Sequence, residues 1–167
     1  YVLNNIKNIT SSDFSAICEK KVKSDEERLK FIYISDPNLN KHVRLESDSS
    51  YKYHSIHAEN LIGRSMKKNI IVISNGVNSD ERTLGIPKDH FKIENFLAIP
   101  LIINELCIGQ IILANNIKEN KYSEEHIYKI YPLIKICTDT LFNIRHRTQY
   151  SITDLLQTKA EVKKTKD

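Results

Sequence analysis

The sequence contains only four glycines, and none of them lies in a pattern that binds phosphate. They fit neither the GxGxxG arrangement of dinucleotide-binding turns nor the GxxxxGK[ST] arrangement of P-loops. Nucleotide hydrolysis by either device is therefore excluded. The four glycines are Gly63, Gly76, Gly85 and Gly109.

Cysteine is equally scarce. Cys18, Cys107 and Cys137 are odd in number and far apart, and they form neither a CxxC pair nor a Cys/His cluster. This usage excludes a structural zinc site and predicts a reducing compartment, so we expect a cytoplasmic protein. Each thiol is expected to be buried as a small apolar side chain.

Long apolar runs are absent as well. The longest run, residues 96–103, is shorter than a membrane span and is interrupted by Pro100. No basic and apolar leader follows Tyr1, and a start at Tyr rather than Met indicates a piece of a longer protein. We expect no membrane segment.

Neither sign of charge dominates. Lys plus Arg number 25 against 21 Asp plus Glu, and the basic residues are scattered until the C-terminal tail, which does not favour nucleic acid as a partner. Hydrophobic residues make up 40% and charged residues 28%, as in a globular protein. A length of 167 residues predicts one domain and a tail.

Hydrophobic periodicity predicts a mixture of helices and strands along the chain. A polar connection precedes the second helix, and a turn-rich segment follows the third strand. In chain order the predicted elements are a helix at 1–9, strands at 14–22 and 29–35 joined by a charged hairpin, a connection at 36–53, a helix at 55–66, a strand at 69–74, the turn-rich segment 75–95, and strands at 96–103 and 106–113.

The last two strands form the clearest hairpin. They are separated by Asn104 and Glu105 alone, and Asn tolerates the positive φ that a two-residue turn needs. Both strands are almost continuously apolar, which predicts central strands covered on both faces.

A long helix is predicted after Ser123, which is a good N-cap followed by two glutamates. Pro132 is expected to kink it. Beyond Arg145 the apolar stripe weakens, so we predict a domain over residues 1–145 and a linking helix over 146–167. The stripe consists of Ile127, Ile130, Ile134, Cys137, Leu141 and Ile144.

Several short motifs then occur in a characteristic order. They are Ser74-Asn75, Asp80 to Arg82, Gly85-Ile86-Pro87 through His90, Phe96 to Leu101, Gly109 through Asn115-Asn116, and Tyr122-Ser123. Together they resemble the GAF domain family of bacterial-type sensor kinases and diguanylate cyclases, and the resemblance covers roughly residues 8–144.

This resemblance implies an α+β fold. The expected architecture is a central antiparallel sheet of about six strands, with helices on one face and a loop-covered pocket on the other. The implied function is a non-enzymatic sensory module, as in a sensor histidine kinase of a two-component system. It would bind an unidentified small molecule and control a downstream output domain in the same chain.

Segment 75–95 is the candidate lid of that pocket, because a long turn-rich segment beside an apolar sheet can cover a small molecule. A simpler interpretation remains open, in which Asn75 and Asp80 close turns and Arg82 pairs with a carboxylate. The predicted ligand-binding residues are Asn75, Asp80, Arg82, His90, Phe96, Tyr53 and His57.

No cofactor is assigned. His54 and His57 are three residues apart on the predicted short helix, but no third ligand has a clear place beside them, so no metal site is predicted. Bilin-binding members use a cysteine usually followed by His, whereas Cys107 and Cys137 are followed by Ile and Thr. The positions that resemble the cyclic-nucleotide motif also depart from it, at Asn116-Ile117 and after Tyr122.

We expect a parallel homodimer through the terminal helices, because the apolar stripe of the last helix continues beyond the reach of the sheet. Two alternatives remain. One is a purely structural dimerisation module with an unused pocket, and the other is a methionine sulfoxide reductase. The predicted dimer contacts are Ile6, Ile9, Ile134, Leu141 and Ile144.

Overall fold

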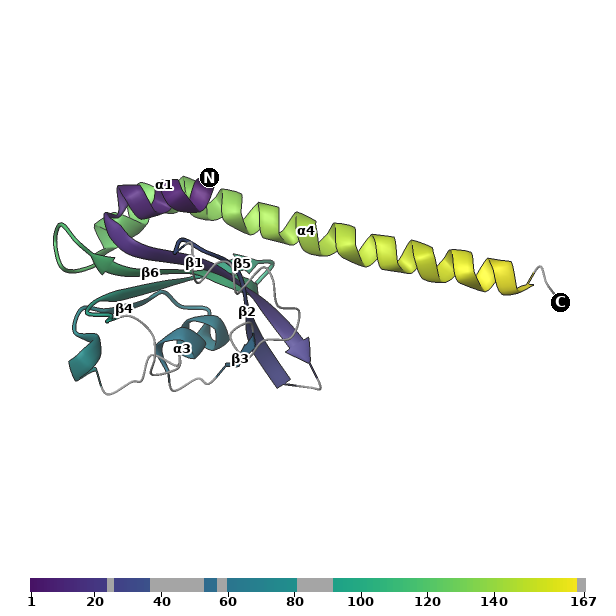
Figure 1. Ribbon diagram of the computed structural model, residues 1–167, viewed down its shortest axis with the longest axis horizontal. Helices are drawn as coiled ribbons and strands as arrows, with labels where there is room; N and C mark the ends of the chain where they lie inside the picture. Colours follow the sequence, from purple (N-terminus) through teal and green to yellow (C-terminus); the bar gives the residue numbers. More distant parts are fainter. Residues whose placement is uncertain (24–25, 37–52, 57–59, 81–91, 165–167) are drawn as a thin grey trace.

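The computed structural model describes residues 1–23, 26–36, 53–56, 60–80 and 92–164. Its centre is one six-stranded antiparallel sheet in the order β3-β2-β1-β6-β5-β4 (Figure 1). The predicted α+β fold with about six strands is confirmed. The strands are β1 (Ser12–Lys23), β2 (Glu26–Ile34), β3 (Tyr53–Ser55), β4 (Val72–Ser74), β5 (Phe96–Ile103) and β6 (Leu106–Asn116).

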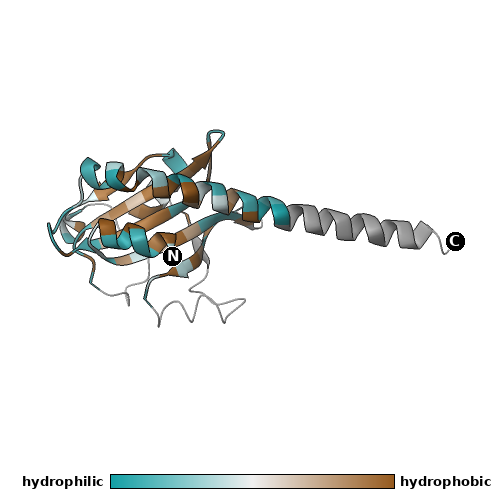
Figure 2. Cartoon of the chain, turned by 90° about the horizontal axis from the view of Figure 1, so that it is seen from above, coloured by the Kyte–Doolittle hydropathy of each residue, from teal (hydrophilic) through white to brown (hydrophobic). Residues whose placement is uncertain are grey.

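Two helices from opposite ends of the chain cover one face of the sheet. Helix α1 (Val2–Ile9) lies beside the first part of α4 (Glu124–Lys164) (Figures 1 and 2). The rest of α4 projects well past the sheet (Figure 1). Strand residues such as Leu97 and Ile111 pack with Ile130 of α4 in one buried cluster. Burial of this apolar surface holds α1 and the first part of α4 on the sheet.

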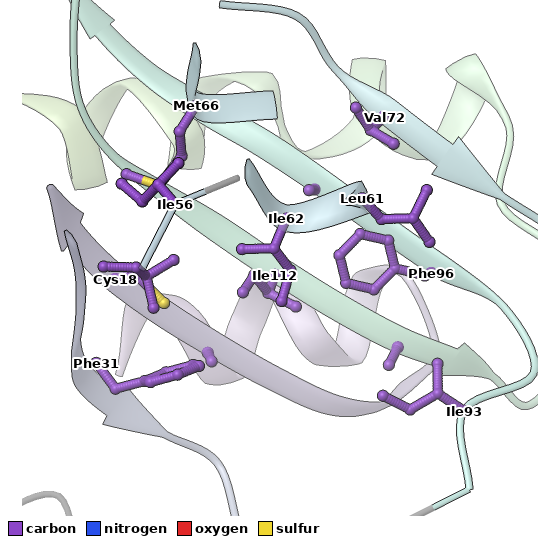
Figure 3. Packing of buried hydrophobic residues seen from close by; sticks show 14 of the residues in the cluster. Cys18, Phe31, Ile56, Leu61, Ile62, Met66, Val72, Ile93, Phe96 and Ile112 are labelled. Carbon is purple, nitrogen blue, oxygen red and sulfur yellow. The ribbon is translucent and has the colours of Figure 1, made fainter. Parts of the chain in front are cut away.

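The opposite face carries helix α3 (Leu61–Lys68). Leu61, Ile62 and Met66 of α3 belong to a second buried cluster with Phe96 and Ile112 of the sheet (Figure 3). This face was expected to be covered by loops, and α3 adds a helix to it because the buried side of α3 is apolar. Residues 81–91 of the expected lid lie outside the described residues.

The β5–β6 hairpin turns as predicted, with φ of 47° at Asn104 and 65° at Glu105. By contrast, β1 and β2 extend further than predicted and leave only residues 24–25 between them. The prediction assigned the charged residues 23–28 to the connection between the two strands. Residues 26–28 instead belong to β2, where Glu27 Oε1 pairs with Lys20 Nζ of β1 at 2.6 Å.

The predicted helix 55–66 was placed too early. Residues 53–55 form β3, and α3 begins after Asn60, whose side-chain oxygen accepts a hydrogen bond from the Gly63 N–H at 2.6 Å. Asn69 ends α3 in the left-handed conformation with φ of 55°. Strand β4 therefore starts at Val72, later than the predicted 69.

Helix α4 is continuous from Glu124 to Lys164 and contains Pro132. Pro132 and Tyr128 are both exposed, so water can satisfy the Tyr128 carbonyl that the proline leaves without its helical donor. The helix passes residue 145 without interruption, and the domain boundary there stays a prediction. Within the described part of the chain, no helix has the length and apolarity to cross a membrane.

Candidate functional site

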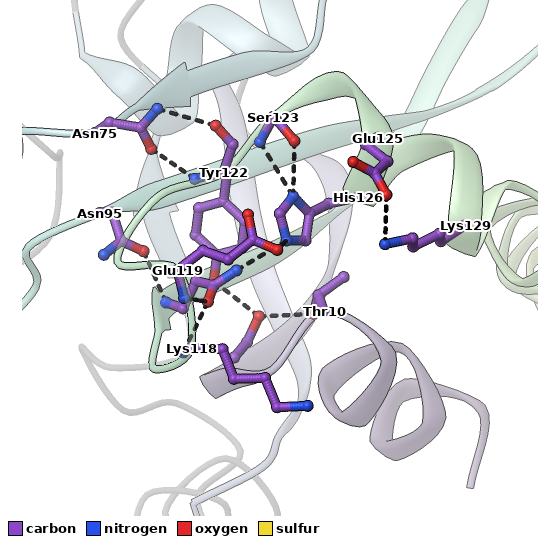
Figure 4. A network of polar contacts seen from close by, with 12 residues as sticks. Thr10, Asn75, Asn95, Lys118, Glu119, Tyr122, Ser123, Glu125, His126 and Lys129 are labelled. Atoms are coloured by element: carbon purple, nitrogen blue, oxygen red, sulfur yellow. Dashed lines mark hydrogen bonds and ion pairs between the residues drawn. The ribbon is translucent and has the colours of Figure 1, made fainter.

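Asn75, a predicted ligand residue, joins two elements of the fold (Figure 4). Its Nδ2 donates to the Tyr122 carbonyl at 2.9 Å, and its Oδ1 accepts from the Tyr122 N–H at 2.7 Å. Both polar ends of the side chain are therefore engaged with backbone. Asn75 fastens the end of β4 to the segment that leads into α4.

The other predicted ligand residues lie on different elements, and some lie outside the described residues. Asp80 Oδ2 accepts a hydrogen bond from the Ser74 hydroxyl at 2.6 Å, and Phe96 is fully buried in the α3-side cluster. Tyr53 is the first residue of β3 and pairs with Lys30 of β2. Three predicted residues, Arg82, His90 and His57, lie outside the described residues.

A polar network continues from Asn75 along the same end of the sheet. Asn95 Oδ1 accepts from the Asn116 N–H at 2.7 Å, while Asn116 Oδ1 accepts from the Lys118 and Glu119 N–H groups at 3.0 and 2.8 Å. Asn116 Nδ2 lies 2.9 Å from His126 Nε2. On the other side of the ring, His126 Nδ1 lies 3.2 Å from the Ser123 backbone nitrogen and 3.0 Å from Ser123 Oγ.

Tyr122 extends this network toward the N-terminus. Its buried hydroxyl lies 2.7 Å from Ser12 Oγ, which lies 2.7 Å from Thr10 Oγ1. Burial raises the pKa of the Tyr122 phenol well above its usual value. The phenol is therefore neutral at physiological pH, and the network is structural in character.

The α3 side of the sheet holds a different kind of polar group. Gln110 of β6 is fully buried, and among the described residues neither its Oε1 nor its Nε2 has a hydrogen-bond partner. The Ser65 hydroxyl of α3 is likewise buried without a partner. Our sequence analysis did not select either residue, although a lone glutamine in an otherwise apolar strand is a visible signal.

Two cysteines, Cys18 and Cys107, belong to the buried layer between the sheet and α3. Burial raises the pKa of both the Cys18 and the Cys107 thiols. Cys107 Sγ also donates to the Gly109 carbonyl at 3.1 Å. The predicted buried character of the cysteines is confirmed, since all three are free and buried.

Charged side chains pair at the edge of this layer. Glu27 Oε1 contacts Lys20 Nζ at 2.6 Å, and Glu27 Oε2 lies 3.7 Å from Lys67 Nζ of α3. The hydrogen bond from Lys20 lowers the pKa of the Glu27 carboxyl. Among the described residues, no group of three or more His, Cys, Asp or Glu side chains could hold a metal ion.

The opposite face carries an apolar groove of about 290 Å³ between α1, α4 and the strands β1 and β2. Ile136 and Ile144 of α4 are 47% and 56% exposed along it. The residues that line it include Val2, Ile17, Ile32, Ile136, Leu141 and Ile144.

The predicted dimer contacts differ in their exposure within the single chain. Ile6, Ile134 and Leu141 are buried where they pack on the sheet. Leu141 also lines this groove, and the dimer contacts stay a prediction. Ile9 and Ile144 are exposed.

No family model matches the sequence, and no curated protein matches it. Solved structures do match the fold. The GAF domain of a Coxiella burnetii phosphoenolpyruvate-protein phosphotransferase has a TM-score of 0.70 at 13% identity, covering 89% of this chain and 82% of that one.

Two further structures show the same likeness. A methyl-accepting chemotaxis protein segment has a TM-score of 0.63 at 9% identity, with 86% of this chain and 85% of that one covered. A type II free methionine-R-sulfoxide reductase from Thermoplasma acidophilum has a TM-score of 0.59 at 14% identity, with 84% and 87% covered. This chain has the fold of a GAF domain.

Proposed function

We propose that this chain is a non-enzymatic, cytoplasmic GAF-type sensory module of a signal-transduction protein, with a sensor histidine kinase as the favoured class. The observation that carries the proposal is the unequal covering of the sheet. Helices α1 and α4 pack on one face and leave the apolar groove between them, whereas on the other face the described residues supply only the eight-residue α3. A small molecule would bind on this α3 face.

The fold likeness to a chemotaxis protein supports a signalling role. Helix α4 supplies the route to an output domain, because it begins at the Asn75–Tyr122 junction and continues beyond the sheet. A ligand that binds two arrangements of the α3 face with different affinity would shift their populations. The sheet would pass that shift to α4, which packs on its other side.

A homodimer through the terminal helices is part of the proposal. An isolated helix of about 15 residues or fewer is marginal in water, and the projecting part of α4 is not much longer. A second copy of α4 would stabilise it. The groove between α1 and α4 continues toward this projecting part through Ile136 and Ile144, which makes these two residues the expected contacts.

Thermal unfolding with a panel of metabolites and nucleotides tests the sensing role. We expect at least one compound to raise Tm, because a ligand that binds the folded state stabilises it. Mass spectrometry of the purified protein should also detect a molecule that is released on denaturation. If neither experiment finds a ligand while light scattering shows a dimer, the alternative of a structural dimerisation module replaces this proposal.

The second candidate is a methionine sulfoxide reductase, which the likeness to the Thermoplasma acidophilum enzyme favours. Thiolates are the reactive form of cysteine, and burial raises the pKa of all three thiols in this chain. We therefore expect no turnover of free methionine sulfoxide. Turnover that is abolished by Cys107→Ser would establish the enzyme instead.

A further inference from the structure

Gln110 is an unusual residue for the middle of a buried sheet. It lies on β6 between apolar neighbours, is fully buried, and has neither amide atom paired among the described residues. Buried side-chain polar groups in folded proteins nearly always have a partner, either in the protein or in a bound molecule. An unpaired amide at this position therefore requires an explanation.

The direction of Gln110 follows from its neighbour. A Cβ at Gly109 would lie 2.7 Å from Leu141 Cδ2, so position 109 faces α4. Successive residues of a strand point to opposite faces, and Gln110 therefore faces α3. Its cross-strand partner Cys18 and its same-strand neighbour Ile112 both point into the α3-side cluster (Figure 3).

A second unpaired group lies across the same layer. Ser65 belongs to the buried side of α3, and its hydroxyl has no partner among the described residues. Of the four buried side-chain atoms without a partner in the described part of the chain, three belong to Gln110 and Ser65. Unpaired hydrogen-bonding groups therefore lie on both sides of this layer, on the sheet at Gln110 and on α3 at Ser65.

The chemistry of the missing partner follows from the amide. Gln110 offers an acceptor and a donor side by side, and the complementary group is a planar amide, lactam or nucleobase edge. A neutral partner fits better than an ion, because Cys18 and Ile112 beside the amide are uncharged. Lys20 and Lys67, at the edge of this layer, both pair with Glu27. Met66 is a flexible wall that can make room.

We infer that Gln110 is the polar anchor of a small neutral ligand with an amide-like edge, bound between the sheet and α3. This inference rests on the proposed sensory function and specifies the ligand class of that site. The Ser65 hydroxyl provides a further hydrogen bond from the opposite wall.

The test compares the wild-type protein with Gln110→Met, which keeps the volume and removes the amide. The probes are nicotinamide and hypoxanthine, with nicotinate as the charged counterpart of nicotinamide. We expect the two neutral probes to raise the wild-type Tm and nicotinate not to. The variant should bind them about 10- to 100-fold more weakly, as expected for the loss of paired hydrogen bonds.

Without any probe, Gln110→Met should unfold at a higher temperature than the wild type, because the unpaired amide is gone. Ser15→Ala is the matched control. It removes a buried hydroxyl that also lacks a partner, but on β1 next to Ile17 and Ala16 with its side chain on the α4 face, so probe binding should be unchanged.

Two results would overturn the inference and leave the sensory function intact. One is a wild-type protein that binds charged compounds of the broad panel but neither neutral probe. The other is a Gln110→Met variant that binds the probes as the wild type does, or unfolds at a lower temperature. The absence of any ligand for the wild type would instead remove the sensory function itself.

Discussion

At the scale of single residues, Asn75 is the predicted ligand residue whose side chain most clearly stabilises the fold. Replacement by Ala removes two hydrogen bonds to the Tyr122 backbone. We expect Asn75→Ala to lower the free energy of unfolding by about 1–2 kcal/mol. Urea titration followed by circular dichroism measures this.

Asn78→Ala is the control for this variant, because Asn78 is an exposed residue of the adjacent 3₁₀ turn Val77–Ser79. Its effect should stay within about 0.5 kcal/mol. Equal effects of the two substitutions would mean that the Asn75 contacts do not stabilise the fold.

Tyr122 predicts a response to alkaline pH. Burial raises the pKa of its phenol in the folded state, so the folded protein holds the proton more tightly than the unfolded chain does. The resulting stabilisation is complete below the unfolded pKa of about 10 and is lost as the pH rises above it. In urea titrations from pH 9 to pH 11, the wild type should lose more stability than Tyr122→Phe does.

At pH 7 the same Tyr122→Phe variant should be about 1 kcal/mol less stable, since it lacks the hydroxyl that lies next to Ser12. Identical pH profiles of the two proteins would contradict the role assigned to this buried phenol.

Residue identity alone predicted little of the candidate site. The side chains that bind small molecules are also those that close turns, and Asn75 has its polar atoms engaged with backbone. Gln110 was overlooked because a strand of this kind is recognised by its apolar residues, and one polar residue does not change that pattern. The burial of an unpaired amide depends on which face each strand residue takes, which requires the register of β1, β5 and β6.

At the scale of secondary-structure elements, Gly109 is the point where two elements come closest. A Cβ there would collide with the Cys18 carbonyl oxygen of β1, which is backbone and cannot move aside cheaply, and would also press on Leu141 of α4. We expect Gly109→Ala to destabilise the protein by more than about 3 kcal/mol, measured by urea unfolding.

Gly76→Ala supplies the comparison for Gly109→Ala. Its added Cβ would lie 2.8 Å from Ser79 Oγ, a side-chain atom that can rotate away. The cost should be below about 1 kcal/mol. A small effect at Gly109 would show that β1 and β6 can separate there without loss of the fold.

Elements with strong local signals could be predicted from the sequence, and those defined by distant contacts could not. The β5–β6 hairpin has its turn residues and two apolar runs in one stretch. Strand β3 is three residues long and exists because it pairs with β2, a contact that no local pattern encodes. The start of α3 was missed although Asn60 is a recognisable N-cap.

At the scale of the whole molecule, the exposed apolar residues of α4 predict the oligomeric state. We expect the wild type to have twice the monomer mass in light scattering, and Ile136→Glu combined with Ile144→Glu to have the mass of a monomer. Charged side chains at a buried helix contact are costly because they lose their hydration. Both isoleucines are exposed in the single chain, so its own fold should survive.

Tyr128→Glu is the control for the dimer experiment, since Tyr128 is 74% exposed on α4 and does not line the groove. It should leave the mass unchanged. A monomeric wild type, or a dimer that survives both glutamates, would remove the terminal helices from the interface.

The arrangement of the whole chain was the part that sequence reasoning predicted best. The order of helices and strands identified the fold because many weak signals agreed. The separation of buried from exposed positions on α1 and α4 was not predictable, because a helical stripe does not say whether its own sheet or a second molecule covers it. Ile134 and Leu141 are covered by the chain's own sheet.

The unbroken course of α4 turns it into a lever. From Arg145, whose Nε lies 3.4 Å from Glu19 Oε1 of β1, to Lys164 the helix adds about 19 residues at about 1.5 Å each, a lever arm of roughly 28 Å. A tilt of about 5° at the sheet therefore displaces the far end by about 2.5 Å. A motion at the sheet that is too small to disturb its packing would therefore move the far end of α4 by about the width of a side chain.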